Sequence, residues 1–166
     1  SVLVIDHAAA PGEKIRISGG GRCNFTNTGT RPDRFLSANP RFAVSALARY
    51  APARFIELVD RYGIAWHEKT LGQLFCDGSS SQIINLLTAE MAQAGVTLML
   101  HTSLSAVERT ATGFRLSLSN GDVTCDALVV ASGGKSIPKM GATALGYQLA
   151  TRFGLRVTET RPALVP

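Results

Sequence analysis

The sequence has few charged residues and few cysteines. Charged residues make up 17% of the 166 positions and hydrophobic residues 45%, which excludes a highly charged, disordered chain and favours a globular domain with a core. The three cysteines, Cys23, Cys76 and Cys125, lie far apart, form no CxxC pair and have no histidine at metal-ligand spacing. This pattern predicts neither a metal site nor a disulfide framework, and it fits a reducing, cytoplasmic setting.

Long apolar runs and clusters of basic residues are also missing. No segment is long and apolar enough to span a bilayer, and the start, SVLVIDH, lacks the basic region of a signal peptide, so we expect no membrane partner. The formal net charge is +5 and the pI is about 9.5, a balance that suits an anionic ligand such as a nucleotide. Because the arginines are scattered rather than gathered in one stripe, we expect no nucleic-acid partner; a basic DNA-binding domain is kept as a minor alternative.

Two continuous apolar runs, residues 2–6 and 127–131, are typical of strands that are buried on both faces of a parallel sheet. Helices are predicted between and after them, over residues 40–50, 52–62, 79–94 and 143–153, with Ser79 and Gln82 as a capping box. Further strands are predicted over about residues 64–68, 73–78, 96–100, 104–110, 113–119 and 123–132, with a hairpin at Asn120-Gly121. The pattern predicts a mixed α/β fold, a parallel sheet with helices and an inserted antiparallel β-meander, that is incomplete at both ends.

Asp6 stands at the end of the first predicted strand. In a Rossmann unit, an acid at the end of the second strand binds the ribose hydroxyls, about 20 residues after a GxGxxG turn. That turn would precede Ser1, so this hypothesis treats the chain as a fragment or a truncated protein. The alternative is an acid that merely ends a strand at the surface. His7, which follows, could stack on or border a nucleotide.

Residues 8–29 are rich in Gly, Pro, Ser and Asn and predict a long shaped loop, with or without a helical turn. Within it, SGGGRCN offers successive backbone N–H groups for an anion, and Arg22 could hold charge or stack on a ring. The motif is neither GxGxxG nor GxxxxGK[ST], and the alternative interpretation is a flexible solvent loop. Cys23 is interpreted either as a thiol made reactive by Arg22 and the glycine N–H groups, which would lower its pKa, or as a small residue packed against the ligand, which we favour.

A second glycine-containing segment, ASGG at residues 131–134, follows the second apolar run. Small residues at the exit of a strand would let a cofactor lie against the backbone, although an ordinary strand-to-loop turn would have the same composition. His67 and His101 are expected to have packed or surface roles.

Five stretches carry a resemblance to a known family: VLVID, GEKIRISGGGRCNFTN, WHEKTLGQLF, LVVASGGKSIPKMGATALGY and RPALVP. Together they resemble the aminoacetone-oxidase/BaiN-like NAD(P)/FAD-dependent flavoproteins of the glutathione-reductase-type superfamily. The resemblance covers nearly the whole chain, and SGGGRCN is its most specific part. It implies an incomplete FAD/NAD(P)-binding Rossmann-like domain. Residues 1–166 would be a partial FAD-binding domain that starts at the second Rossmann strand and ends where a substrate domain would begin.

The same resemblance implies a set of cofactor-binding residues. Asp6 takes the place of the family's ribose-binding acid, which is most often glutamate, and Leu104 stands where a backbone contact to adenine is made. The pyrophosphate and flavin side would be lined by Lys14, Ser18, Gly19, Gly20, Gly21, Arg22, Cys23 and Asn24. Ala131, Ser132, Gly133 and Gly134 match the family's ATGG segment, with serine for threonine. The N-terminal GxGxxG turn and the C-terminal part of the family are absent from this sequence, and Ala144 replaces a frequent glycine.

The resemblance thus implies the FAD-binding part of a cytoplasmic flavin-dependent oxidoreductase, with redox chemistry at the flavin ring. FAD is the expected cofactor and NAD(P)H a candidate electron donor; the substrate is an unknown small molecule, and no catalytic residue stands out. The alternatives are a nucleotide-binding module without turnover and a fragment of an NAD-type dehydrogenase. Exposed edges of the parallel sheet predict self-association.

Overall fold

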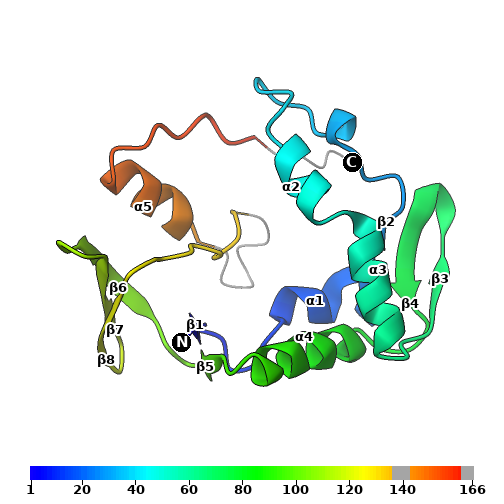
Figure 1. Cartoon of the computed structure of the whole chain (residues 1–166), viewed down its shortest axis with the longest axis horizontal. Helices are drawn as coiled ribbons and strands as arrows, with labels where there is room; N and C mark the ends of the chain where they lie inside the picture. Colours follow the sequence, from blue (N-terminus) through cyan, green and yellow to red (C-terminus); the bar gives the residue numbers. More distant parts are fainter. Residues whose placement is uncertain (136–142, 162–166) are drawn as a thin grey trace. The chain divides into compact units, whose positions relative to one another are not determined.

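The computed structural model describes residues 1–135 and 143–161 (Figure 1). The chain divides into two compact units, Ser1–His101 and Thr102–Pro166. Parts of the quoted motifs, SIPKMGA and the end of RPALVP, lie outside the described residues. Among the residues that are described, no helix is both long enough and apolar enough to cross a membrane.

The first unit contains a parallel pair of strands. Strand β1 (Leu3–Ile5) pairs with β5 (Thr97–Met99), and Val4 lies opposite Leu98, which confirms the parallel strand predicted at residues 2–6. The prediction that both faces of this strand are buried is wrong, because Val4 is 37% exposed. Its one partner in the described sheets is β5, and a two-stranded sheet leaves the strand open to solvent.

The second sheet of this unit is antiparallel, in the order β2-β4-β3. Strands β3 (Trp66–Glu68) and β4 (Gln73–Cys76) confirm the two short strands expected around Gly72. The third strand, β2 (Asn24–Asn27), lies inside the segment predicted to be a loop, which also contains α1 (Glu13–Ile17). Phe25 explains this difference: its ring lies 6.1 Å from Phe55 and 6.3 Å from Trp66, and this packing fixes a strand that asparagines alone would not favour.

Three helices complete the first unit: α2 (Val44–Arg49), α3 (Pro52–Arg61) and α4 (Ser81–Gln93). Helix α3 begins with its proline as predicted. Helix α2 begins later than Pro40: the Asn39 side chain accepts from the Arg41 N–H (3.1 Å), as an N-cap does, but residues 40–43 form turns before the helix. The predicted capping box of α4 is also wrong. The helix has no side-chain cap, and the Gln82 Oε1 atom is buried without a hydrogen-bond partner among the described residues.

The core of the first unit joins these elements. Its buried members are Cys23, Leu58, Val59, Ile64, Cys76, Ile83 and Leu86. They come from the end of the glycine run, from α3 and the turn after it, from β4 and from α4, so the glycine run is attached directly to the core.

The second unit holds the predicted β-meander. Strands β6 (Leu104–Arg109), β7 (Phe114–Leu118) and β8 (Gly121–Cys125) pair antiparallel in sequence order. The hairpin at Asn120-Gly121 is confirmed, since Leu118 pairs with Gly121 across the turn. Helix α5 (Leu145–Arg152) confirms the last predicted helix, and the Phe153 ring that follows it lies 6.0 Å from Phe114.

The second apolar run, residues 127–131, does not form the predicted buried parallel strand. No strand of the described sheets pairs with it, and Val129 is 85% exposed. A strand is stabilised by hydrogen bonds to a neighbour, so an apolar run without one stays extended but irregular. The chain is nevertheless a Rossmann-like α/β chain with a parallel strand pair, helices and antiparallel sheets.

Candidate cofactor-binding site

The glycine run after α1 adopts a left-handed backbone over three successive residues. In the 3₁₀ segment Ser18–Gly21, the φ angles of Gly19, Gly20 and Gly21 are 59°, 67° and 84°. Only glycine adopts such angles in succession without a steric cost. We call residues 18–23 the glycine loop.

The three glycines have different surroundings. A Cβ atom at Gly19 would lie 2.6 Å from the Phe75 ring and 2.9 Å from the Asn24 nitrogen, so this position needs glycine for packing. A Cβ atom at Gly20 or Gly21 would meet nothing within 4 Å. The backbone of these two residues is therefore open to close approach by a ligand.

The other side of the glycine loop is held by the junction of β4 and α4. The Cys76 N–H donates to the Arg22 carbonyl (3.1 Å) and the Ser80 N–H donates to the Gly21 carbonyl (2.7 Å). The Ser80 hydroxyl, which belongs to a residue only 2% exposed, donates to the Arg16 carbonyl (2.9 Å). Two carbonyl oxygens that would repel an anion are thus engaged by protein donors, and the loop is held in one shape.

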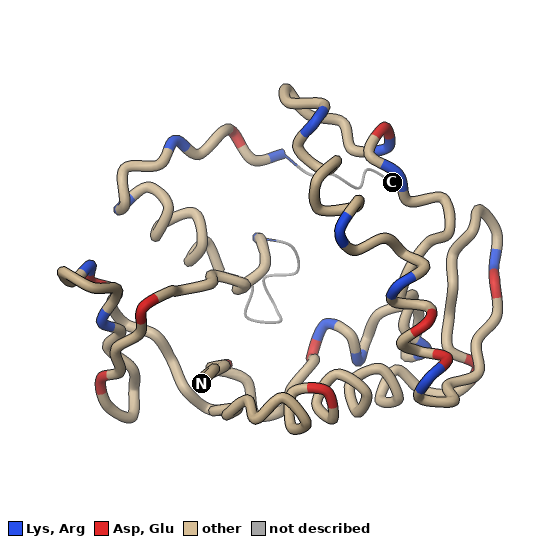
Figure 2. The backbone as a smooth tube through the Cα atoms, viewed as in Figure 1, with Lys and Arg blue, Asp and Glu red and all other residues tan. Residues whose placement is uncertain are grey.

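Two exposed basic residues, Lys14 and Arg22, stand before and after the glycines in the sequence. Lys14 on α1 and Arg22 in the glycine loop are both exposed, and neither takes part in an ion pair within the described residues. Figure 2 shows the basic positions along α1. Uncompensated charge beside open glycine backbone favours an anionic ligand.

Polar side chains at both ends of the glycine loop, Ser18 and the following Asn24, form hydrogen bonds within the protein itself. The Ser18 hydroxyl donates to the Ile15 carbonyl (2.9 Å), and the Asn24 amide, in the orientation that satisfies its neighbours, donates to the carbonyls of Leu74 (3.2 Å) and Thr26 (3.0 Å). These residues would therefore act on a cofactor through the shape of the backbone.

Cys23 lies in the core and is only 4% exposed. Burial raises the pKa of its thiol, and a hydrogen bond with Ser18 offsets part of this effect. The hypothesis of a thiol with a lowered pKa is therefore wrong. The cysteine packs among core side chains such as Leu58 and Ile83, and its expected packing against a ligand stays a prediction.

Asp6 and His7 follow β1 directly. The Asp6 N–H donates to the Met99 carbonyl (2.9 Å), and its Oδ1 atom accepts from the Ala8 N–H (3.0 Å), with the His7 Nδ1 atom 3.5 Å away. The Oδ2 atom has no hydrogen bond within the described part of the chain, and the side chain is 42% exposed. One carboxylate oxygen thus fixes the turn while the other is available to a ligand hydroxyl.

The remaining predicted site residues belong to the second unit. Leu104 begins β6, pairs with Leu118 and lines a small pocket with residues of α5. Ala131, Ser132 and Gly133 are exposed, and a Cβ atom at Gly134 would lie 3.3 Å from the Tyr147 hydroxyl. The structure thus places Asp6, His7 and residues 14–24 in the first unit, and Leu104 and residues 131–134 in the second.

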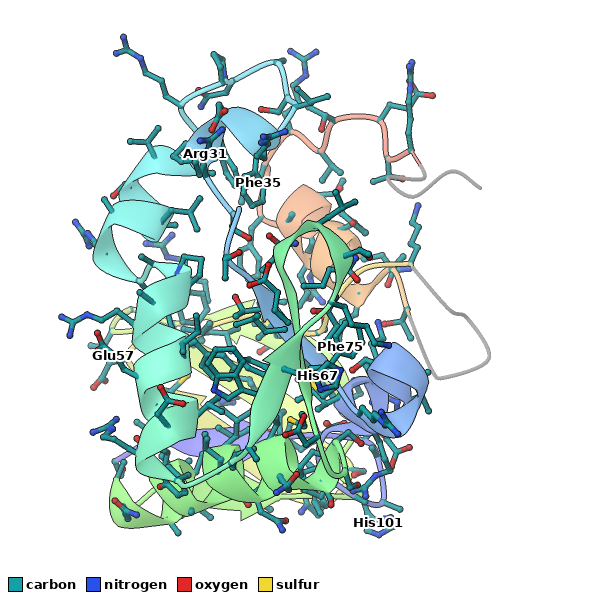
Figure 3. The ribbon with its side chains drawn as sticks, turned by 90° about the vertical axis from the view of Figure 1, so that its right-hand side faces the viewer. Arg31, Phe35, Glu57, His67, Phe75 and His101 are labelled. Atoms are coloured by element: carbon teal, nitrogen blue, oxygen red, sulfur yellow. The ribbon has the colours of Figure 1, made fainter. Side chains whose placement is uncertain are left out.

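A cluster of side chains on the β3–β4 hairpin was not predicted from the sequence (Figure 3). His67 stacks on Phe75 with 6.2 Å between ring centroids, and its Nδ1 atom lies 2.6 Å from the Asp77 carboxylate. Lys69 lies 4.3 Å from the centroid of the same ring. His67 and Lys69 are two positions apart, so they lie on one face of the hairpin, and His67 pairs with Phe75. This arrangement can be recognised in the sequence only when the register of the hairpin is known. In the described parts, no three His, Cys, Asp or Glu side chains gather as metal ligands.

These features fit the pyrophosphate of a dinucleotide such as FAD. The backbone of Gly20 and Gly21 carries no side chain and has open space beside it, and the exposed Lys14 and Arg22 are close to it in the sequence. Residues 1–161 match the HI0933-like protein Rossmann domain. The chain belongs to this family. The resemblance seen in the sequence is thereby confirmed at the level of FAD-binding Rossmann oxidoreductases.

Three curated relatives, all from bacteria, extend this comparison. The chain is 52% identical over 165 residues to the ribosomal RNA dihydrouridine synthase of Escherichia coli (strain K12), covering 99% of this chain and 41% of the relative. It is 46% identical over 170 residues to the protein of that name in Haemophilus influenzae (strain ATCC 51907 / DSM 11121 / KW20 / Rd), covering 100% and 42%. It is 26% identical over 166 residues to the 3-dehydro-bile acid delta(4,6)-reductase of Clostridium scindens (strain ATCC 35704 / DSM 5676 / VPI 13733 / 19), covering 99% and 40%.

The HI0933-like chain thus spans about two fifths of the length of these curated relatives. The names of the two more similar relatives concern ribosomal RNA, so they do not support a specific link to aminoacetone oxidases.

Proposed function

We propose that this chain is the FAD-binding part of a flavin-dependent reductase that converts uridine in ribosomal RNA to dihydrouridine, with NAD(P)H as the electron donor. The observation that supports the cofactor is the glycine loop, with its open backbone at Gly20 and Gly21 and the nearby charges of Lys14 and Arg22. The substrate is proposed from the name of a relative that is 52% identical across 99% of this chain.

The proposed reaction adds two hydrogen atoms across the C5–C6 double bond of uracil. The chemistry that bound FAD supplies is the transfer of a hydride, taken from NAD(P)H, to one of these carbons, and a proton from an acid or water completes the other. NAD(P)H leaves as NAD(P)⁺, so electrons and protons balance.

The residues of this chain bind and orient the cofactor in this proposal. The backbone of Gly20 and Gly21 lets the pyrophosphate approach, and Lys14 and Arg22 offset its charge. The free Oδ2 atom of Asp6 accepts a hydrogen bond from a ribose hydroxyl, while the Ala8 N–H holds Oδ1 in place.

The proposal replaces two expectations that were drawn from the sequence. Scattered arginines suggested no nucleic-acid partner and an unknown small-molecule substrate, whereas the names of the relatives favour an RNA substrate. Ribosomal RNA as the substrate also supports a cytoplasmic location, which remains part of the proposal.

The test uses the intact protein that carries this chain. Its bound flavin is released by denaturation and identified by chromatography, and the protein is then incubated with NADPH and unmodified ribosomal RNA. We expect FAD, and dihydrouridine in the digested RNA by mass spectrometry only when NADPH is present. Bound FAD with NADPH oxidation but no dihydrouridine would refute the RNA substrate. Bound FAD without NADPH oxidation would favour a binding module, and NADH binding without flavin would favour an NAD-type dehydrogenase.

A further inference from the structure

The segment from the end of β2 to the first turn of α3 contains several basic residues (Figure 2). Residues 30–54 contain five arginines and a single acid, Asp33. The five arginines, all exposed, are Arg31, Arg34, Arg41, Arg49 and Arg54. They lie three to eight positions apart along the sequence, which is why they form no basic run.

Most of this charge is uncompensated. Arg31 lies 3.2 Å from Asp33, and Arg54 lies 3.8 Å from Glu57, in ion pairs that are open to solvent. The other three arginines of the segment have no ion pair in the part of the chain that the structure describes. The segment is therefore suited to a polyanion.

Each of these three unpaired arginines is followed directly by an exposed aromatic residue. The pairs are Arg34-Phe35, Arg41-Phe42 and Arg49-Tyr50. The exposed fractions of the rings are 47% for Phe35, 77% for Phe42 and 54% for Tyr50. Phe35 is labelled, with Arg31 nearby, in Figure 3. We call these six residues the arginine–aromatic pairs.

Single exposed apolar residues are common and need no explanation. A repeated combination of an exposed ring and an arginine, in contrast, indicates a particular kind of ligand. Unpaired nucleic acid presents bases that stack on aromatic rings and phosphates that attract arginine, with little dependence on sequence. A base that is to be modified must also leave its stack, so an enzyme acting on ribosomal RNA meets an unpaired strand.

We propose that the arginine–aromatic pairs bind the unpaired strand of the ribosomal RNA substrate, with each ring under a base and each arginine at a phosphate. This inference rests on the proposed function, because the RNA substrate comes from there. RNA fits better than a protein partner, because three cations, each followed in the sequence by an exposed ring, match the repeating phosphate and base of a nucleotide chain.

The test measures binding of the intact protein to a fluorescent oligouridine of 12 nucleotides by anisotropy, at several KCl concentrations and without NADPH. The charge variant combines Arg34→Gln, Arg41→Gln and Arg49→Gln. Its control removes the same charge from exposed positions of the second unit, as Arg109→Gln, Arg115→Gln and Arg156→Gln. The ring variant combines Phe35→Ala, Phe42→Ala and Tyr50→Ala.

We expect the charge variant to bind at least tenfold more weakly than its control, with a slope of log K against log salt that is smaller by about 2, since each phosphate contact contributes about 0.7 for single strands. The ring variant is expected to bind at least tenfold more weakly with an unchanged salt slope. Equal binding by the charge variant and its control would overturn the inference, as would failure of the parent protein to bind the oligonucleotide.

Flavin content and the unfolding temperature of every variant test the alternative that the rings are covered by another part of the same protein. If the ring variant loses stability or flavin while each single ring variant binds RNA like the parent, the rings pack against another part of the protein and the inference is wrong. The binding assay needs no turnover, so it is independent of the proposed reaction. If the parent protein makes dihydrouridine but the variants bind RNA normally, the proposed function stands and this inference is wrong. If the pairs bind RNA but no dihydrouridine is made, the proposed function is wrong.

Discussion

Gly20→Ala is the substitution that tests the glycine loop most directly. The structure offers a matched control in Gly95, which ends α4: both glycines have a φ angle of 67°, and a Cβ atom at either would meet nothing within 4 Å. An alanine in this left-handed conformation costs about 1 to 2 kcal/mol, so both variants should lose the same free energy of unfolding. Only at Gly20 does the added methyl group occupy the space proposed for the pyrophosphate.

The expected difference is therefore in cofactor affinity alone. Losing a hydrogen bond to a charged group costs about 1.5 to 3 kcal/mol, which corresponds to a Kd for FAD that is about tenfold to a hundredfold higher in Gly20→Ala. The assay pairs urea unfolding of the flavin-free protein with a fluorescence titration of the same protein with FAD. If Gly20→Ala and Gly95→Ala bind FAD equally well, the open backbone at Gly20 is not a cofactor contact, and the site proposed here is refuted.

Three further outcomes are expected. Ser80→Ala should lower the free energy of unfolding by about 1 to 3 kcal/mol and weaken FAD binding, because it leaves the Arg16 carbonyl of α1 without its donor. Ser45→Ala, at an exposed position of α2, should do neither, and equal effects of the two substitutions would refute a role of the Ser80 hydroxyl in shaping the glycine loop. Asp6→Asn should raise the Kd for FAD about tenfold while the exposed control Asp122→Asn leaves it unchanged, and an unchanged Kd for Asp6→Asn would remove that residue from the site. Burial, more than neighbouring charges, raises the pKa of the Cys76 thiol from 9.0 to about 11. As the pH rises, the thiol therefore ionises first in the unfolded state, and the free energy of unfolding should fall by up to about 3 kcal/mol between pH 9 and 11. A Cys76→Ala variant that shows the same fall would contradict this.

The elements predicted correctly are those whose signals are local. Pro52 at the first helical position fixes where α3 begins, and Asn120-Gly121 fixes the turn of the β7–β8 hairpin, since each acts within a few residues. The shape of the glycine loop was foreseeable for the same reason, because consecutive glycines are needed where the backbone is left-handed.

The errors concern features that depend on distant partners. Strand β2 exists because β4, about fifty residues later, pairs with it, and no local pattern in NFTN reveals that. Residues 127–131 have the composition of a buried strand, but none of the described strands pairs with them. Ser79, which was expected to form a capping box with Gln82, accepts instead from the Ser81 N–H (3.2 Å), while its neighbour Ser80 donates to the Arg16 carbonyl, 64 positions earlier.

That last hydrogen bond has a consequence for how the protein is made. The glycine loop leaves the ribosome long before Cys76 and Ser80, the residues that hold its carbonyls, and the Ser80 to Arg16 bond spans 64 positions. At about 5 to 20 residues per second, synthesis of that interval takes roughly 3 to 13 s. During this time the nascent chain contains the whole SGGGRCN motif without the contacts that give it its shape. Capture of the cofactor should therefore begin only after translation has passed residue 80, however early the binding motif itself is made.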